Sequence, residues 1–281
     1  MISVIIPANN EEAYIRDCLG ALSRSEPLPG DAAVQVIVVA NGCTDDTADM
    51  ARAQRPAFAE KGWTLEVLDL PQGSKIAALN AGDAAALYGM RIYIDADIGV
   101  TPALIAQLAQ VLDQPAAAYA SGQIRVPPAR SFLSDRYARF WQSLPFITNG
   151  VPGCGVYAVN AAGRARWGVF PKIISDDTFA RYHFAPDEMH AVPAPFSWPV
   201  TEGFASLVRV RRRQDAGLEE IRHGWPELAA RMAPTAPDTG EKLRLFLRDP
   251  LGFVIYAAVA VTVRTPLFRN RDGWHLSLIH I

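Results

Sequence analysis

The sequence has few cysteines and no pattern that would link them. Its three cysteines, Cys18, Cys43 and Cys154, lie far apart and form no C-x-x-C pair. A disulfide framework needs more cysteines, and a structural zinc site needs closely spaced ones. We therefore expect free thiols and a reducing compartment, the cytoplasm.

The chain also lacks an excess of positive charge. It has 27 lysines and arginines against 29 aspartates and glutamates, which gives a formal net charge of -2. Binding to nucleic acid usually relies on a basic excess that neutralises phosphates. We therefore expect no nucleic-acid partner.

Long hydrophobic runs are missing as well. Residues 1–7 have no basic stretch before a long apolar run, so we expect a structural segment there rather than a signal peptide. Residues 251–263 are apolar, but a bilayer span needs about 20 residues. This segment predicts a helix that packs inside the protein or makes peripheral contact with the inner face of a membrane. The arginines around it favour an anionic surface: Arg244, Arg248, Arg264, Arg269 and Arg271.

Two common nucleotide-binding fingerprints are absent. No G-x-G-x-x-G follows the first predicted strand, and Gly73-Ser74-Lys75 lacks the spacing of a phosphate-binding P-loop. These absences exclude an NAD enzyme and a P-loop NTPase as leading interpretations.

Short apolar runs alternate with amphipathic stretches through the first 125 residues. Strands are predicted at 2–7, 34–39, 65–70 and 91–95, and helices at about 11–25, 44–54, 74–89 and 102–113, the last with Thr101 as its N-cap. Such alternation predicts an α/β fold with a mostly parallel sheet flanked by helices. We expect a nucleotide-binding half (1–126), an acceptor half (127–232) and a C-terminal helical extension (240–270), with a linker near 234–240.

Polar residues follow the predicted strands, at the edge where open α/β sheets bind ligands. Asp95 and Asp97 come directly after the fourth strand. The alternation of an extended chain places both carboxylates on one side, where they could hold a divalent ion that binds a diphosphate. The alternative is a solvated loop in which Asp97 caps the next helix.

Taken together, the order of the motifs resembles the family 2 glycosyltransferases, which are inverting enzymes with the GT-A (Rossmann-like) fold and nucleotide-sugar donors. The resemblance covers about residues 1–215. It rests on six motifs in the family's order: residues 4–12, 38–47, 75–82, 95–97, 153–155 and 175–177.

The resemblance implies a set of site residues. Asp177 stands at the position of the family's catalytic base, and Asp97, helped by Asp95, at that of the ligands for Mg or Mn. The donor nucleotide would be bound by Pro7, Asn10, Glu11, Asn41, Lys75 and Asp95. The acceptor and the diphosphate would be contacted by Gly153, Gly155, Asp176 and Arg212.

Some of these positions depart from the family or have a plainer interpretation. Many relatives have an aspartate pair where this chain has Ala40-Asn41, so the base, uracil or guanine, stays open. The Q-x-x-R-W motif of processive relatives is absent around Arg209–Gln214, and this basic run could bind the diphosphate, an anionic acceptor or membrane surface, or only solvent. Asn10 and Asn41 could simply form turns. For His183 and His223 two interpretations stay open: a third metal ligand or a structural histidine.

The predicted function is transfer of a sugar from a UDP- or GDP-linked donor to a hydroxyl acceptor, which could be a glycan, a lipid-linked molecule or a small molecule. The oligomeric state stays open. One alternative is a sugar-phosphate nucleotidyltransferase, although its usual glycine-rich basic loop is missing after the first strand. The other is a non-catalytic sugar-nucleotide-binding protein, which would not need both Asp97 and Asp177.

Overall fold

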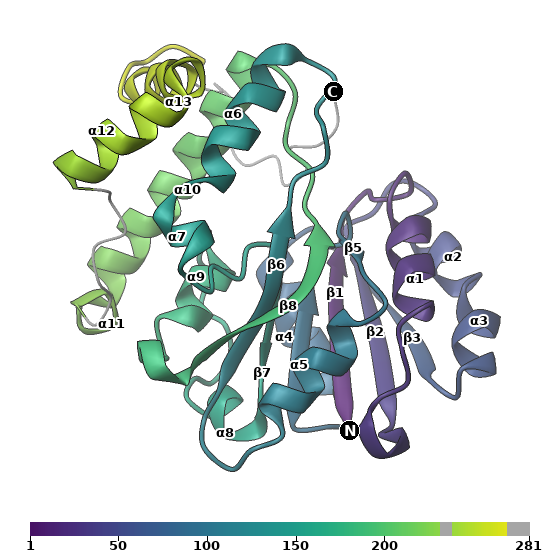
Figure 1. The fold of residues 1–281 in the computed structure, drawn as a ribbon. Helices are drawn as coiled ribbons and strands as arrows, with labels where there is room; N and C mark the ends of the chain where they lie inside the picture. The colour runs from purple at the N-terminus through teal and green to yellow at the C-terminus, as the bar shows by residue number, and fades with distance from the viewer. Residues whose placement is uncertain (231–237, 269–281) are drawn as a thin grey trace.

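A computed structural model describes residues 1–230 and 238–268. Within these ranges, eight strands form one curled sheet with helices packed on both of its faces (Figure 1). The strand order across the sheet is β3-β2-β1-β4-β7-β6-β8-β5. The α/β class and the C-terminal helices predicted from the sequence are confirmed.

The first half of the sheet is parallel. It consists of β1 (Ile2–Ala8), β2 (Val34–Asn41), β3 (Thr64–Leu70) and β4 (Met90–Ile94). The second half is mixed: β7 (Val156–Val159) pairs antiparallel with β4 and with β6 (Tyr119–Arg125), β8 (Met189–Ser197) runs parallel to β6, and β5 (Gly99–Val100) pairs antiparallel with β8. Strands from both predicted halves thus complete one sheet, and a boundary at residue 126 stays a prediction.

Successive side chains of β1 pack into two different hydrophobic cores. Val4 and Ile6 belong to the core shared with α1 (Ile15–Ser23), α3 (Arg55–Glu60) and α5 (Leu104–Leu112). Ile5 belongs to the opposite core, shared with α4 (Lys75–Ala85) and α9 (Asp176–Arg181). Because side chains alternate across a strand, a strand buried on both faces needs a nearly continuous apolar run, and β1 has one in which only Ser3 is polar.

The predicted strands agree with the observed ones to within a few residues, but two helix predictions need correction. The helix predicted at 44–54 begins only at Thr47 and ends at Arg52 (α2, Thr47–Arg52). A separate helix, α3, follows it. Thr101 is not the N-cap of α5, because the helix begins at Leu104 and the Thr101 hydroxyl donates to the carbonyl of Pro195 at 2.6 Å.

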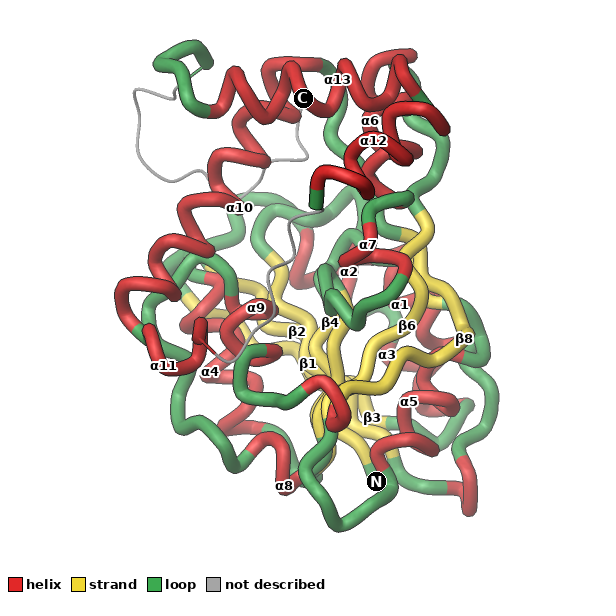
Figure 2. Tube along the Cα trace, turned by 60° about the vertical axis from the view of Figure 1, so that its left-hand side comes forward, coloured by secondary structure: helices red, strands yellow, loops and turns green. Residues whose placement is uncertain are grey.

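Four longer helices form a layer beyond one end of the sheet: α6 (Phe132–Gln142), α10 (Phe204–Gly224), α12 (Thr239–Arg248) and α13 (Pro250–Val263) (Figures 1 and 2). They share an apolar core of their own, built from Tyr137, Phe140, Trp141, Leu144, Leu207, Val208, Leu245 and Val259. The predicted C-terminal helical segment is two helices, because the chain turns at Asp249, whose side chain accepts from the Gly252 amide at 2.9 Å. The short helices are α7 (Pro145–Thr148), α8 (Ala161–Arg164) and α11 (Pro226–Ala230), with 3₁₀ turns at Pro29–Asp31 and Pro186–Glu188.

Among the described helices, none combines the length and the apolar character that crossing a membrane requires. Arg269 and Arg271, which the sequence places beside α13, lie outside the described residues.

Candidate functional site

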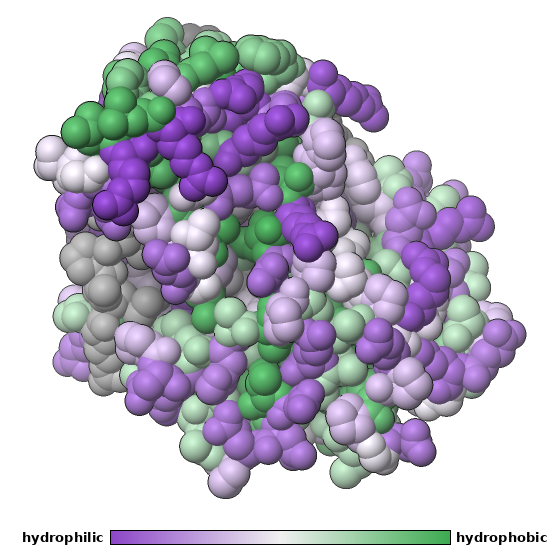
Figure 3. Space-filling model, viewed as in Figure 1, coloured by the Kyte–Doolittle hydropathy of each residue, from purple (hydrophilic) through white to green (hydrophobic). Residues whose placement is uncertain are grey.

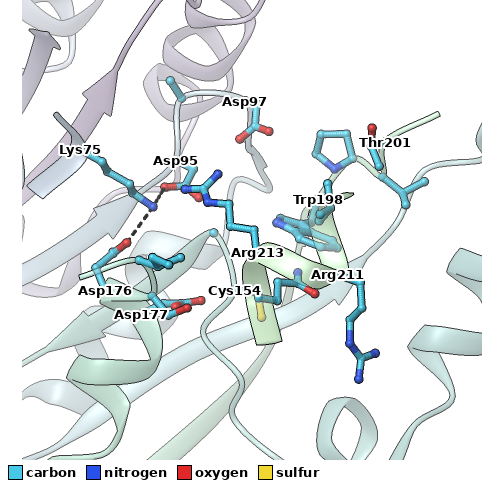
Figure 4. Close-up of a pocket in the computed structure, with 18 of the residues that line it drawn as sticks. Lys75, Asp95, Asp97, Cys154, Asp176, Asp177, Trp198, Thr201, Arg211 and Arg213 are labelled. Atoms are coloured by element: carbon cyan, nitrogen blue, oxygen red, sulfur yellow. Dashed lines mark ion pairs between the residues drawn. The ribbon is translucent and has the colours of Figure 1, made fainter. Parts of the chain in front are cut away.

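A pocket of about 280 Å³ opens at the carboxyl ends of β1, β2 and β4, beneath the helical layer. Its sheet side is lined by Pro7, Asn9, Glu11, Asn41, Lys75, Asp95 and Asp97. Its other side is lined by residues of α6, α9 and α10, the Cys154-Gly155 loop and the segment 198–201 (Figure 4). Ligands of open α/β sheets bind at this edge, so the fold itself points to the pocket.

Lys75 links two carboxylates in the pocket. Its ammonium lies 2.8 Å from Oδ1 of Asp95 and 3.1 Å from Oδ1 of Asp176 (Figure 4). Burial acts to lower the pKa of Lys75, but the charges of Asp176 and Asp95 outweigh it and hold this pKa above its usual value. Lys75 is the first residue of α4, whose N-cap Ser74 accepts from the Ala77 amide, so the helix start fixes the backbone of the lysine.

Asp176 is the most enclosed of the site carboxylates. Only 3% of the residue is exposed, and its Oδ2 accepts from the Tyr157 hydroxyl at 3.2 Å. Tyr157 in turn stacks on Tyr93 with ring centroids 4.7 Å apart. Asp176 thus contacts both Lys75 and Tyr157, and it anchors the lysine at the wall of the pocket. This is the residue that the sequence predicts to contact the acceptor or the diphosphate.

Asp177 lines the pocket from the first turn of α9. Its Oδ1 accepts from the Thr178 amide at 2.6 Å, which orients the carboxylate. Burial, followed by the negative charge of Asp176, raises the pKa of Asp177 to about 6. A half-buried carboxylate with a pKa close to neutral can accept a proton from a substrate hydroxyl.

Three carboxyl groups share the sheet side of the pocket. Burial, together with the negative charges of Asp97 and Asp95, raises the pKa of Glu11 to about 8. Burial and the charge of Asp95 raise the pKa of Asp97 to about 7. In addition, the buried Oε2 of Glu11 has no hydrogen-bond partner within the described chain. The positive charges of the described residues around these carboxyls therefore do not fully compensate their negative charge.

These carboxyls fit a divalent cation in part. An orphaned carboxylate oxygen and mutual repulsion are both relieved by a bound cation, and oxygen ligands suit Mg and Mn. No set of three or more histidines, cysteines, aspartates and glutamates among the described residues is arranged to hold a metal alone. The remaining ligands would therefore be oxygens of a bound diphosphate or water, as is usual for Mg.

The two histidines considered as further metal ligands do not line the pocket. Nδ1 of His183 lies 2.9 Å from the Phe179 carbonyl, and its ring packs against Phe179 and Trp167. His223 is exposed in the last turn of α10, beside Glu219. Of the two interpretations, their positions favour the structural histidine, because packing and helix position direct both rings away from the pocket.

Asn41 lines the pocket, but its amide is engaged within the protein. Its Nδ2 donates to the Ala8 carbonyl at 2.8 Å, and its Oδ1 accepts from the Ser74 amide at 2.9 Å. The residue therefore joins β1, β2 and the turn before α4, which corrects the expectation that its amide is free to read a base. Asn10 has positive φ (55°), accepts from the Thr44 amide at 2.8 Å and does not line the pocket.

Gly153 and Gly155 flank Cys154 with φ of 71° and 74°. A Cβ on Gly153 would lie 1.8 Å from the Tyr119 hydroxyl, and one on Gly155 would lie 2.7 Å from Ile98. Both positions thus need glycine for conformation and for space. Gly155 lines the pocket and Gly153 does not, so only Gly155 lies where a ligand contact was expected.

The basic run on α10 divides between two sides of the helix. Arg212, predicted to meet the diphosphate, instead donates to carbonyls at the end of α13 and directly after it: those of Thr262, Val263, Thr265 and Leu267. Arg213 lines the pocket, extends toward Asp95 and Asp97 (Figure 4), and makes no hydrogen bond or ion pair with the described residues. Among the pocket cations, it is therefore Arg213, rather than Arg212, that has no partner within the described part of the chain.

Several pocket residues were not among the predicted site residues. Trp141 of α6 and Trp198 stack with ring centroids 5.0 Å apart, and both line the pocket. Asn9 also lines it, and its place directly after β1 was the one available clue. Arg211 lines the pocket too, but it is held by Asp215 at 2.9 Å and by the Tyr256 hydroxyl at 2.6 Å.

Solved structures of low sequence identity share this fold. S. aureus TarS residues 1–349 in complex with UDP is 16% identical with a TM-score of 0.56, and the match covers 94% of this chain and 91% of that one. The mannosyltransferase PcManGT from Pyrobaculum calidifontis in complex with GDP-Man and Mn²⁺ is 20% identical with a TM-score of 0.57, covering 94% and 75%. Glucosyl-3-phosphoglycerate synthase from Mycobacterium tuberculosis, in a complex with Mn²⁺ and UDP, is 20% identical with a TM-score of 0.50, covering 85% and 82%.

The match to a longer TarS structure covers only 39% of that chain. No curated protein sequence matches this chain.

A family model matches this chain. The model described as "Glycosyl transferase family 2" matches residues 3–166, more than half of the chain. The protein therefore belongs to glycosyl transferase family 2 and is a glycosyltransferase with the GT-A fold.

Proposed function

We propose that the protein transfers a sugar, with inversion, from a nucleotide diphosphate sugar to a hydroxyl acceptor. The observation that carries the proposal is the arrangement of one pocket, with Asp177 on the α9 side and Asp95 and Asp97 on the sheet side. An inverting transfer needs one carboxylate that takes the acceptor proton and, separately, positive charge that neutralises the leaving diphosphate.

The donor would bind along the sheet side. Similar structures contain UDP, UDP-GlcNAc or GDP-Man, which supports a nucleotide sugar as the donor. Because the amide of Asn41 is engaged within the protein, it cannot read the base without breaking those bonds, and the choice between UDP and GDP rests on other groups. Arg213 offers a guanidinium without a protein partner, whose planar donors match phosphate oxygens.

Asp97 and Asp95 would hold Mg or Mn, with the remaining ligands from the diphosphate and water. Mn²⁺ is present in two of the similar structures. When bound, the cation stabilises the negative charge that develops on the leaving diphosphate. Asp95 also pairs with Lys75, so the lysine would orient this carboxylate.

Asp177 would accept the proton of the acceptor hydroxyl as that oxygen attacks the anomeric carbon on the face opposite the diphosphate. Its carboxylate is held by the Thr178 amide, and its raised pKa makes it a stronger base than an ordinary aspartate. Lys75, paired with the neighbouring Asp176, acts in the opposite direction: its positive charge lowers the pKa of Asp177 and so offsets part of the effect of Asp176.

The acceptor would approach from the side of α6 and α10. Trp141 and Trp198 present apolar ring surface there, beside Gly155. Flat aromatic surface suits an acceptor with apolar patches, a class that includes sugars and lipid-linked molecules. Family membership argues against the nucleotidyltransferase and the non-catalytic alternatives. The three free cysteines support a cytoplasmic location.

The test is a donor panel. Purified protein is incubated with UDP-, GDP- and TDP-linked sugars and Mn, and release of the nucleotide diphosphate is measured with and without acceptors. Release from one donor class, abolished by chelation, supports the proposal, and product with the opposite anomeric configuration by NMR supports inversion. No release from any donor, or a product with retained configuration, contradicts it.

A further inference from the structure

The exposed apolar side chains of the protein are concentrated at one place. Eight of the thirteen large exposed hydrophobic side chains among the described residues lie between positions 243 and 268. Scattered exposed apolar residues are ordinary, whereas a contiguous apolar patch marks an interaction site. Figure 3 shows hydrophobic surface gathered over α12 and α13, bordered by hydrophilic residues.

α13 has two apolar faces. Its inner face packs on α6, where Tyr256 stacks on Tyr137 and Phe253 meets the edge of Phe140. Pro250–Val263 contains no charged residue, so the outer face is apolar as well. Its exposed members lie three, four and three residues apart, which places them on one stripe: Leu251, Val254, Ala258 and Val261.

α12 extends this stripe. Leu243, Phe246 and Leu247 are exposed at helical spacing, and 69% of Leu247 is exposed. Below, "outer stripe" means these three residues together with Leu251, Val254, Ala258 and Val261. Its helices are 10 and 14 residues long, which makes them suited to lie along an interface.

The rim of the outer stripe is basic. Lys242, Arg244, Arg248 and Arg264 are all exposed around it. The acidic residues nearby are committed elsewhere: Asp238 and Glu241 cap the start of α12, and Asp249 pairs with Arg136 and caps α13. An apolar stripe with a positive rim is complementary to a bilayer with anionic headgroups.

A second copy of the chain fits this surface less well. A symmetric dimer would place the stripe against itself and bring the same arginines and lysine of both copies together. Like charges at an interface oppose association, while anionic lipid phosphates attract them.

We propose that the outer stripe and its basic rim dock the protein on the surface of a bilayer that contains anionic lipids. α6 and α10, which receive the inner face of α13, also line the pocket, with Trp141 and Arg213 among the lining residues. Docking would therefore hold the pocket one layer of helices away from the lipid surface. This inference goes beyond the proposed transfer reaction and does not depend on it.

The test is flotation with vesicles of neutral phosphatidylcholine or of phosphatidylcholine with phosphatidylglycerol, at low and high salt. The parent protein is expected to float with the anionic vesicles at low salt and to be released by salt. The double variant Val254→Asp/Val261→Asp should lose at least about tenfold in binding, because charged groups on the buried face oppose insertion. The matched control Val169→Asp alters a residue that is 76% exposed, outside the stripe, and should bind like the parent.

A second variant protects the test against misfolding. Arg244→Gln/Arg248→Gln leaves the apolar stripe intact and removes two charges, each worth about fivefold at an anionic surface, so a loss of about twenty- to thirtyfold is expected. Melting curves and nucleotide-diphosphate binding of all variants should match the parent, which separates this proposal from the transfer reaction. Equal recovery of the parent with neutral and anionic vesicles overturns the proposal. So does self-association by light scattering that the stripe variants abolish while vesicle binding is unchanged.

Discussion

The ammonium of Lys75 lies 2.8 Å from Oδ1 of Asp95, one of the two aspartates that follow β4. The two aspartates therefore differ in their surroundings. Asp95 forms an ion pair with the lysine, whereas Asp97 faces the pocket with a pKa raised to about 7. The same lysine contacts Asp176, the neighbour of Asp177, so one cation connects the sheet side and the α9 side of the pocket. The predictions below separate these roles.

Asp177→Asn should bind nucleotide sugar and Mn like the parent, because a general base acts in the transition state. Its transfer rate should fall at least about a hundredfold, since the amide cannot take the acceptor proton. Calorimetry and initial rates measure the two quantities. Asp187→Asn, an exposed aspartate outside the pocket, is the control and should keep the parental rate. A parental rate for Asp177→Asn would remove this residue from the mechanism.

The transfer rate should depend on pH through Asp177. Its raised pKa, about 6, means that the carboxylate still carries a proton at a pH where an ordinary aspartate has lost it. The rate should therefore be constant above pH about 7 and fall about tenfold per pH unit well below 6. Rates from pH 5 to 8 at saturating donor test this. A flat profile over that range would contradict the assignment.

Asp97→Asn should abolish Mn-dependent donor binding without lowering the melting temperature of the metal-free protein. The substitution removes one of the carboxylates that repel each other around Glu11, and relief of this repulsion should offset the lost attraction between Asp97 and Lys75. Calorimetry with and without Mn, together with thermal melts, measures both effects. Unchanged Mn-dependent affinity would exclude Asp97 as a ligand.

Arg213→Ala and Arg212→Ala should have opposite effects although the residues are adjacent. Loss of the Arg213 guanidinium should weaken nucleotide-diphosphate binding about ten- to a hundredfold with little change in stability, because hydrogen bonds to charged groups contribute about 1.5–3 kcal/mol. Arg212→Ala should leave affinity unchanged and lower the melting temperature, because it leaves the carbonyls after α13 without a donor. The reverse pattern would restore Arg212 as the diphosphate ligand.

Gly153→Ala should destabilise the protein by at least about 2 kcal/mol, because a side chain at φ 71° is strained and its Cβ would overlap the Tyr119 hydroxyl. Denaturant unfolding measures the free energy. Gly168→Ala is the matched control, since a Cβ there meets nothing within 4 Å and φ is not positive. Equal stability of the two variants would show that the glycine loop moves freely.

The sequence by itself determined the fold class and the edge of the sheet that carries the site. Buried parallel strands require largely apolar runs, so the strands predicted at 2–7, 34–39 and 91–95 were recognisable. Their polar ends must meet at one edge, which pointed to Asp95, and the order of the motifs pointed to Lys75 and Asp177; all three line the pocket. These signals are local along the chain, which is why they survive without tertiary information.

The tertiary structure alone decided which side chains are free to act. Successive side chains on a helix point about 100° apart. Which of Arg212 and Arg213 faces the pocket therefore depends on where α13 packs. The amide of Asn41 is engaged because Ala8 and Ser74, distant in sequence, come within hydrogen-bond distance of it. The Trp141 and Trp198 stack likewise arises from a contact between segments far apart in the chain, and a local pattern carries no record of that contact.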